Sequence, residues 1–402
     1  MKRVSTAILV GCLVMTLFTG CWNRRELNEL GILSGAAIDK VGDEYQVAAQ
    51  VVIPDQVSMR STKGGTPVTM YKASAPTLFE AFRKLTTTSP RKIYTAQIRV
   101  LVLGESIARE GIAKVMDLLV RNPETRTDYV VVIAKNTEAE NVLKVLTPLE
   151  KIPADSLFDS LDTAAKIWAP ITKVTADKLV DQFTAKGINP VLPGVGIINE
   201  VHIDKSSSFM EKIDYPIKLK FSGLAVFRKD KFVGWLGTNE GRGYNYITNN
   251  VEASVNNLPC QDGNLLSFEI IRSTTNMKSR LVNDEPIIEI KLEIEANISE
   301  ISCDIDINNP HNIEVLEKNA ADKIEKLMQH TVQLVQKKYK VDIFGFGQSI
   351  YKNYPDKWKL LEKDWDSHFA NLKVAYDVRF HIRTTGMTTN TLERTMKENQ
   401  YD

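Results

Sequence analysis

The run Asp128-Tyr-Val-Val-Val-Ile-Ala134 decides how the first half of the chain is expected to fold. A short, continuous apolar run rich in β-branched residues is typical of a strand that is buried on both faces. Ile98–Leu103 has the same character, and Ser106–Val120 between them carries apolar side chains at helical spacing. Strand and helix therefore alternate over residues 68–135, which predicts an α/β or α+β unit with one central sheet.

The segments on either side extend this unit. Residues 32–38 and 45–53 are β-rich runs around an Asp- and Gly-containing loop, which predicts a hairpin. Residues 54–67 are rich in Pro, Gly and Ser and predict a loop. Residues 137–186 are expected to be mainly helical, and residues 190–198 return to a strand.

The second half of the chain has a different pattern. We expect a hairpin at 218–236, strands at 264–273 and 286–300, a long helix at about 313–338, and a last strand at 372–383. The helix carries one apolar stripe opposite Lys and Glu residues, so it is expected to cover one face of a sheet. The predicted fold class is α+β and multi-domain, with an N-terminal mixed α/β region and a C-terminal antiparallel sheet covered by a long helix.

Composition changes set the predicted domain limits. Residues 200–215 are polar and include three consecutive serines, Ser206 to Ser208. We predict a signal peptide (1–20), an N-terminal α+β domain that can divide into two subdomains (21–200), a linker (201–215), a C-terminal α+β domain (216–387) and a flexible tail (388–402).

The first twenty residues have the form of an export signal. Lys2 and Arg3 precede a mostly apolar run that is shorter than the roughly 20 residues a spanning helix needs. Leu17-Phe-Thr-Gly-Cys21 resembles a bacterial lipobox, in which the cysteine thiol takes a diacylglycerol, although Phe18 stands where Leu is usual. The alternatives are an ordinary signal peptide or an uncleaved anchor with Cys21 incidental. Lipidation of Cys21 would anchor the chain to a lipid bilayer outside the cytoplasm.

Composition places the chain among ordinary globular proteins. The 402 residues carry a formal charge of +1, which becomes −1 when residues 1–20 leave with Lys2 and Arg3 and no acidic residue (+1 − 2 = −1). With 25% charged and 43% hydrophobic residues, nothing indicates a nucleic-acid partner. After Cys12 and Cys21, only Cys260 and Cys303 remain, and they either form a disulfide or stay as two buried free thiols.

No catalytic, metal or cofactor site is expected. The five histidines lie at positions 202, 311, 330, 368 and 381, with no pair at metal-ligand spacing. Asp364 and Asp366 flank Trp365, and a solvated helix edge explains this carboxylate pair better than acid/base chemistry. The chain is therefore not expected to be an enzyme.

Several segments together resemble the Ger(x)C family of spore germination lipoproteins, the C subunits of nutrient germinant receptors. The segments that carry the resemblance are Cys21–Leu30, Gly223–Phe227, Lys231–Leu236, Glu240–Gly243, Tyr339–Gly347, Trp358 and Trp365–Phe369. Trp22-Asn23 stands where the family often has Trp-Asp. The resemblance implies an α+β fold without known enzymatic activity, on the outer surface of the spore inner membrane. It also implies assembly with two polytopic membrane subunits into a complex that responds to nutrients.

Arg24 and Arg25 lie next to the predicted anchor, so they are candidate contacts to anionic lipid or to a membrane partner. Ion pairs within the N-terminal domain are the alternative. The leading hypothesis is a non-catalytic receptor subunit whose contact with the nutrient germinant can be indirect. The second hypothesis is an extracytoplasmic lipoprotein that captures a small molecule itself.

Overall fold

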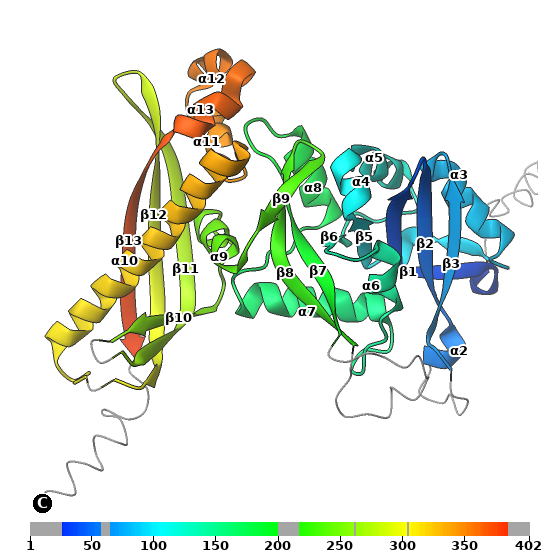
Figure 1. Ribbon diagram of the computed structural model, residues 1–402, viewed down its shortest axis with the longest axis horizontal. Helices are drawn as coiled ribbons and strands as arrows, with labels where there is room; N and C mark the ends of the chain where they lie inside the picture. Colours follow the sequence, from blue (N-terminus) through cyan, green and yellow to red (C-terminus); the bar gives the residue numbers. More distant parts are fainter. Residues whose placement is uncertain (1–25, 58–64, 200–216, 261–262, 304, 385–402) are drawn as a thin grey trace, which may run out of the picture.

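The computed structural model describes residues 26–57, 65–199, 217–260, 263–303 and 305–384. Within these ranges the chain forms a nine-stranded sheet and a four-stranded sheet, with helices packed on both. Figure 1 shows an elongated molecule in which the smaller sheet and its long helix occupy one end. The predicted α+β fold class is confirmed.

The larger sheet has the strand order β3-β2-β1-β5-β6-β7-β8-β9, with β4 paired to β1. Its strands are β1 (Leu30–Val41), β2 (Glu44–Val52), β3 (Val68–Ala75), β4 (Lys92–Tyr94), β5 (Val100–Gly104), β6 (Val130–Ala134), β7 (Val191–Asn199), β8 (Ile217–Arg228) and β9 (Lys231–Leu236). The central strands β1, β5, β6 and β7 run parallel, and antiparallel pairs flank them. Every residue of β5 and β6 is buried, as their unbroken apolar runs predict.

Helices cover both faces of this sheet because side chains alternate along each strand. Leu101 and Leu103 face one apolar cluster, whereas Val100 and Val102 face another. The first face packs against α3 (Leu78–Lys84), α4 (Glu105–Glu110), α5 (Ala113–Arg121) and α8 (Ala176–Thr184), and the second packs against α6 (Ala139–Lys144) and α7 (Pro153–Ile167). The helix expected at 106–120 is two helices, because Gly111 has a φ of +134° that no regular helix accepts.

Short helical turns connect these elements. They are η1 (Leu27–Glu29), α2 (Pro54–Val57), η2 (Leu85–Thr87) and η3 (Thr95–Gln97).

The β8–β9 hairpin lies in the larger sheet, whereas we expected it in the C-terminal domain. β8 pairs with β7, for example through Leu192 and Ala225, so strands on both sides of the predicted linker are hydrogen-bonded neighbours. Burial explains the placement, because Leu224–Phe227 is fully buried only when covered from both sides. The linker at 201–215 and the tail at 388–402 lie outside the described residues, and the division into domains stays a prediction.

The smaller sheet has the order β10-β11-β12-β13. Its strands are β10 (Ser254–Pro259), β11 (Leu265–Val282), β12 (Glu285–Ile301) and β13 (Lys373–Thr384). The first two pairs are antiparallel as predicted, but β12 and β13 run parallel, because the helical residues 310–371 between them form a crossover connection. Asn283 and Asp284 turn the long β11–β12 hairpin, both with positive φ (52° and 64°), as a type I′ turn requires.

A 25-residue helix, α10 (Pro310–Leu334), crosses one face of this sheet diagonally (Figure 1). Its buried residues Leu316, Ala320, Ile324 and Met328 repeat every four positions and join the sheet's core. Asn309 caps its start, and a π-helical turn, η5 (Val335–Tyr339), ends it. The remaining elements are α9 (Thr238–Ile247), α11 (Phe346–Asn353), α12 (Pro355–Leu361), η6 (Glu362–Asp364) and α13 (Trp365–Asn371). The core of the smaller sheet continues into the larger one through Leu224, Val226 and Leu236.

Candidate functional site

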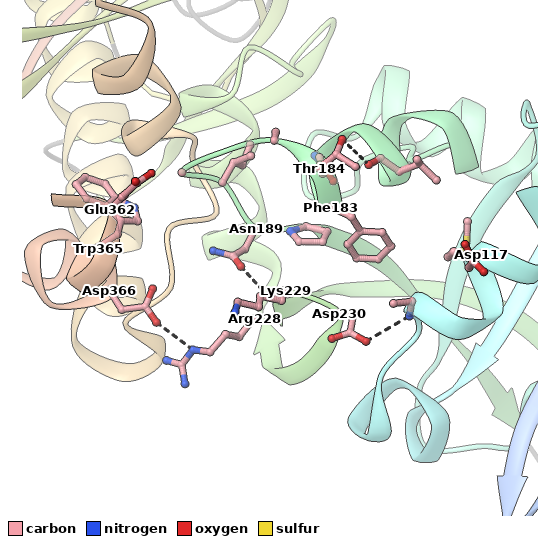
Figure 2. A pocket seen from close by; sticks show the side chains of 18 of the residues that line it. Asp117, Phe183, Thr184, Asn189, Arg228, Lys229, Asp230, Glu362, Trp365 and Asp366 are labelled. Carbon is pink, nitrogen blue, oxygen red and sulfur yellow. Dashed lines mark hydrogen bonds and ion pairs between the residues drawn. The ribbon is translucent and has the colours of Figure 1, made fainter. Parts of the chain in front are cut away.

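A groove of about 800 Å³ lies where the two halves of the chain meet. One wall is formed by α5 and α8, the other by α12 and α13, and the β8–β9 turn lies between them (Figure 2). Apolar side chains such as Met116, Phe183 and Trp365 line it, and charged side chains such as Asp117, Lys229 and Glu362 lie at its rim. The groove therefore offers both apolar area and charge to a bound group.

The β8–β9 turn holds the two walls together. Its left-handed residue Lys229 (φ 55°) donates its backbone N–H to Asn189 Oδ1 over 2.7 Å. On one side, Ile112 N donates to the carbonyl oxygen of Asp230 over 2.9 Å. On the other side, Arg228 Nε lies 3.3 Å from a carboxylate oxygen of Asp366, as Figure 2 shows. The turn thus contacts both walls.

The wall that carries α12 and α13 rests on one buried carboxylate, Asp342. One of its oxygens accepts hydrogen bonds from the backbone N–H groups of residues 344 (3.0 Å), 345 (3.0 Å) and 346 (3.3 Å). The other accepts from Gly347 N (2.7 Å) and from Trp365 Nε1 (3.2 Å). Burial raises the pKa of Asp342 to about 6, against the lowering effect of the backbone N–H groups. One side chain therefore organises the Phe344–Gly347 turn and fixes the indole of Trp365.

The same residue connects this wall to the opposite one. The carbonyl oxygen of Asp342 accepts from the backbone N–H of Asn189 (2.8 Å) and from its side-chain Nδ2 (3.2 Å). Beside this contact Gln348 N donates to the carbonyl oxygen of Gly187 over 3.1 Å. A Cβ on Gly347 would lie 2.8 Å from Gly187 Cα, so only glycine allows this backbone approach.

Two buried polar atoms of the groove lining have no hydrogen-bond partner among the described residues. They are Trp358 Nε1, a donor, and Gln182 Oε1, an acceptor. Buried polar atoms are rarely left unpaired, so such a pair indicates where a bound group or water would bond. A peptide unit supplies one acceptor and one donor, the two kinds of group that these atoms lack.

The chemistry predicted to be absent can be compared with the described residues. No group of three or more His, Cys, Asp or Glu side chains in the described ranges is placed to hold a metal ion. Asp366, considered above as half of a carboxylate pair, is ion-paired with Arg228. His330 lies 3.6 Å from Glu240, on an exposed face.

Two family descriptions match the sequence. "Spore germination protein N-terminal domain" matches residues 23–197, and "Spore germination B3/ GerAC like, C-terminal" matches residues 222–386. The chain belongs to the GerAC family of spore germination proteins. The family resemblance drawn from the sequence is thereby confirmed.

Curated relatives of this GerAC family chain match it over nearly its whole length. Spore germination protein KC of Bacillus subtilis (strain 168) is 29% identical over 406 residues, which cover 99% of each chain. Spore germination protein B3 of the same organism is 24% identical over 399 residues, covering 96% of this chain and 99% of that protein. The crystal structure of the GerBC protein is similar in fold, with a TM-score of 0.55, 19% identity, and coverage of 87% of this chain and 96% of that one.

The predicted site residues of this GerAC family member fall into two groups. Cys21, Arg24 and Arg25 lie outside the described residues, and their roles stay predictions. Cys260 and Cys303 are joined by a disulfide in the structure, with their Cα atoms 6.2 Å apart. Across the described parts of the chain, no helix combines the length and the apolar composition that crossing a bilayer requires.

Sequence reasoning missed the groove and Asp342. A signal was present, because Asp342 is an isolated carboxylate in the otherwise apolar run Val341–Phe344. A charge in such a run indicates a buried carboxylate with local donors. Asn189 carried no comparable signal, because its partners Lys229 and Asp342 are far away in the sequence.

Proposed function

We propose that this GerAC family member is a non-catalytic subunit of a spore germinant receptor, tethered by lipid on Cys21 and assembled with two polytopic membrane subunits. The spore germination proteins that match it end to end support the receptor role. The lipobox-like Leu17–Cys21 supports the tether. The location proposed with it is the extracytoplasmic face of the spore inner membrane, as the family resemblance implies.

One observation carries the proposal: the two family matches, residues 23–197 and 222–386, each supply one wall of the same groove. α5 and α8 belong to the first match, and α12 and α13 belong to the second. We infer that this groove receives an extended segment of a membrane subunit. The unpaired Trp358 Nε1 and Gln182 Oε1 suit a peptide C=O and N–H, and the charged rim suits a polar segment.

Site-specific photocrosslinking in spores tests the groove. A photoreactive amino acid at Lys229, in the groove, should give an adduct with a polytopic receptor subunit that mass spectrometry identifies. The matched control is Val315, which is 42% exposed on α10 and is not part of the groove lining. Equal adducts at both positions, or none at Lys229, would overturn the assignment of the groove.

The tether is tested separately at Cys21. Wild-type chain should incorporate radiolabelled palmitate and sediment with membranes, whereas Cys21→Ala should lose the label and appear in the soluble fraction. Labelling that persists in Cys21→Ala would count against this site. Arg24→Gln with Arg25→Gln then measures whether the two arginines add to membrane or partner binding.

A second candidate function is direct capture of a small molecule. The volume of the groove, about 800 Å³, lies within the range of small-molecule sites, roughly 300–1,000 Å³. Calorimetry of the chain against amino acids and sugars tests this. Saturable heat that Ala113→Trp, which fills the groove from α5, abolishes would favour it over the docking of a protein segment.

A further inference from the structure

A partly buried arginine on α9, Arg242, has no carboxylate partner among the described residues. No carboxylate in the described part of the chain forms an ion pair with it, and its Nε atom is buried without a hydrogen-bond partner there. Its guanidinium carbon lies 4.4 Å from the centre of the Trp168 ring, at the end of α7. Burial lowers the pKa of Arg242, because removal from water disfavours its charged form.

The packing of α9 explains why Arg242 lies inside the fold. A Cβ on Gly241 would clash with the carbonyl oxygen of Pro170, and a Cβ on Gly243 would clash with the side chain of Thr331 on α10. Glycine on both sides of Arg242 therefore lets α9 approach the loop after α7 and α10 at once. The arginine between them is held at the place where these elements meet.

A second cation faces the same place. Lys323 of α10 donates through Nζ to the carbonyl oxygen of Asn257 on β10. Lys323 is exposed overall, but partial desolvation and then the charge of Arg242 lower its pKa, so the two cations are close enough to repel each other. Like charges held together without a counterion are costly, and a bound anion would remove this cost.

Two polar side chains of β10, the strand that Lys323 contacts, are buried with one unpaired atom each among the described residues. Ser254 and Asn256 are 2% and 8% exposed, and Ser254 Oγ and Asn256 Nδ2 have no hydrogen-bond partner among the described residues. They alternate with exposed residues on β10, so both point to the helix-covered face of the sheet. β10 is held beside the end of α7, because Ala253 N donates to the carbonyl oxygen of Lys166.

We propose that Arg242, Lys323, Ser254 and Asn256 form a binding site for an oxyanion, a carboxylate or a phosphate. All four side chains can donate hydrogen bonds, so an acceptor matches them, and both cations select a negative charge. The Trp168 ring against the guanidinium is itself 45% exposed, and Lys323 is exposed as well, so the site lies close to the protein surface. The site does not touch the groove, and it does not depend on the proposed docking function.

Calorimetric titration of the full chain in detergent tests the site, with sodium phosphate and sodium acetate as probes and sodium chloride at equal ionic strength as the reference. Saturable binding of phosphate identifies a phosphate site, and saturable binding of acetate identifies a carboxylate site. In either case Arg242→Gln and Lys323→Gln should each weaken binding at least tenfold. Lys326→Gln, one turn further along the exposed face of α10, should leave it unchanged.

Stability without ligand gives a second readout. If the site binds an anion, Arg242 carries an unpaired charge in the ligand-free protein. Arg242→Gln removes that charge and should leave the melting temperature of the ligand-free protein unchanged or higher. Lys323 is exposed, so Lys323→Gln should fold even if the Arg242 variant does not. Absence of saturable binding by both probes, or equal weakening by Lys326→Gln, would overturn the proposal and leave a water-filled polar site.

Discussion

Asp342 connects several parts of the molecule through a single side chain. Five donors converge on its two oxygens, and its carbonyl oxygen binds Asn189 across the groove. The desolvation of this carboxylate and its hydrogen bonds act in opposite directions on its pKa, and desolvation is the larger effect. The ionisation of Asp342 is therefore linked to the stability of the groove.

We predict a pH-dependent effect of Asp342→Asn. Because the pKa of Asp342 is raised from 3.8 to about 6, the folded chain keeps this proton at pH values where the unfolded chain has lost it. This group therefore stabilises the fold most at pH 4, and its contribution falls as the pH rises to 6. At pH 4 the free energy of unfolding of Asp342→Asn should be about 1–3 kcal/mol lower than that of the wild type, because one amide oxygen cannot accept hydrogen bonds from all the donors.

The difference in free energy of unfolding between the wild type and Asp342→Asn should shrink by up to about 3 kcal/mol between pH 4 and pH 7, at about 1.4 kcal/mol per pKa unit. Chemical denaturation at both pH values measures it, with Asp356→Asn as the control because the Asp356 side chain is 94% exposed. A loss that widens with pH would show that the pKa of Asp342 is lowered in the folded chain.

At the scale of elements, the contact between α11 and the loop that follows α8 sets the position of one groove wall. Gly187 and Gly347 approach closely there, with the rings of Trp358 and Trp365 against Gly347. We predict that Gly347→Ala lowers the free energy of unfolding by about 1–3 kcal/mol, because its Cβ would meet atoms at 2.7 and 2.8 Å.

Thermal unfolding and the photocrosslinking yield from Lys229 measure this effect together. Gly196→Ala is the control, because its Cβ would meet only the carbonyl oxygen of Lys135, at 3.3 Å. Equal destabilisation by both substitutions would mean that the close approach at Gly347 is not special.

At the scale of the whole molecule, the Cys260–Cys303 disulfide closes a loop of 43 residues around the β11–β12 hairpin. Such a crosslink stabilises by about 4 kcal/mol in the chain-entropy model. We predict that replacing both cysteines with serine lowers the free energy of unfolding by roughly 3–4 kcal/mol, measured by denaturant titration without reductant. Intact-mass analysis that finds two alkylatable thiols in untreated protein would contradict this prediction.

The elements that local pattern defines were predictable from the sequence. The buried strand at Val130–Ala134 and the apolar stripe of α10 follow from runs and periodicities of neighbouring residues. Pairing across long distances was not predictable. The alternation in β8 fits either sheet equally well, and only the pairing of Leu192 with Ala225 assigns it to the larger one.

The candidate site was harder to predict, because its parts are distant in the sequence. Asp342 could have been flagged as a charge within an apolar run, but the groove exists only because Asn189, Lys229 and Asp342 meet in space. The break at Gly111 was also missed, because a glycine within a helical pattern can be tolerated in the helix, and the sequence alone does not give its φ.

The adjacency of β7 and β8 has a consequence for handling the protein. The segment between Asn199 and Ile217 joins two strands that are already bonded to each other along their length. After a protease cut within that segment, the two fragments should therefore co-elute in size-exclusion chromatography, because the shared strand pair and the common core hold them together. Separate expression of either fragment would instead leave a long sheet edge unpaired, and unpaired edge strands promote aggregation.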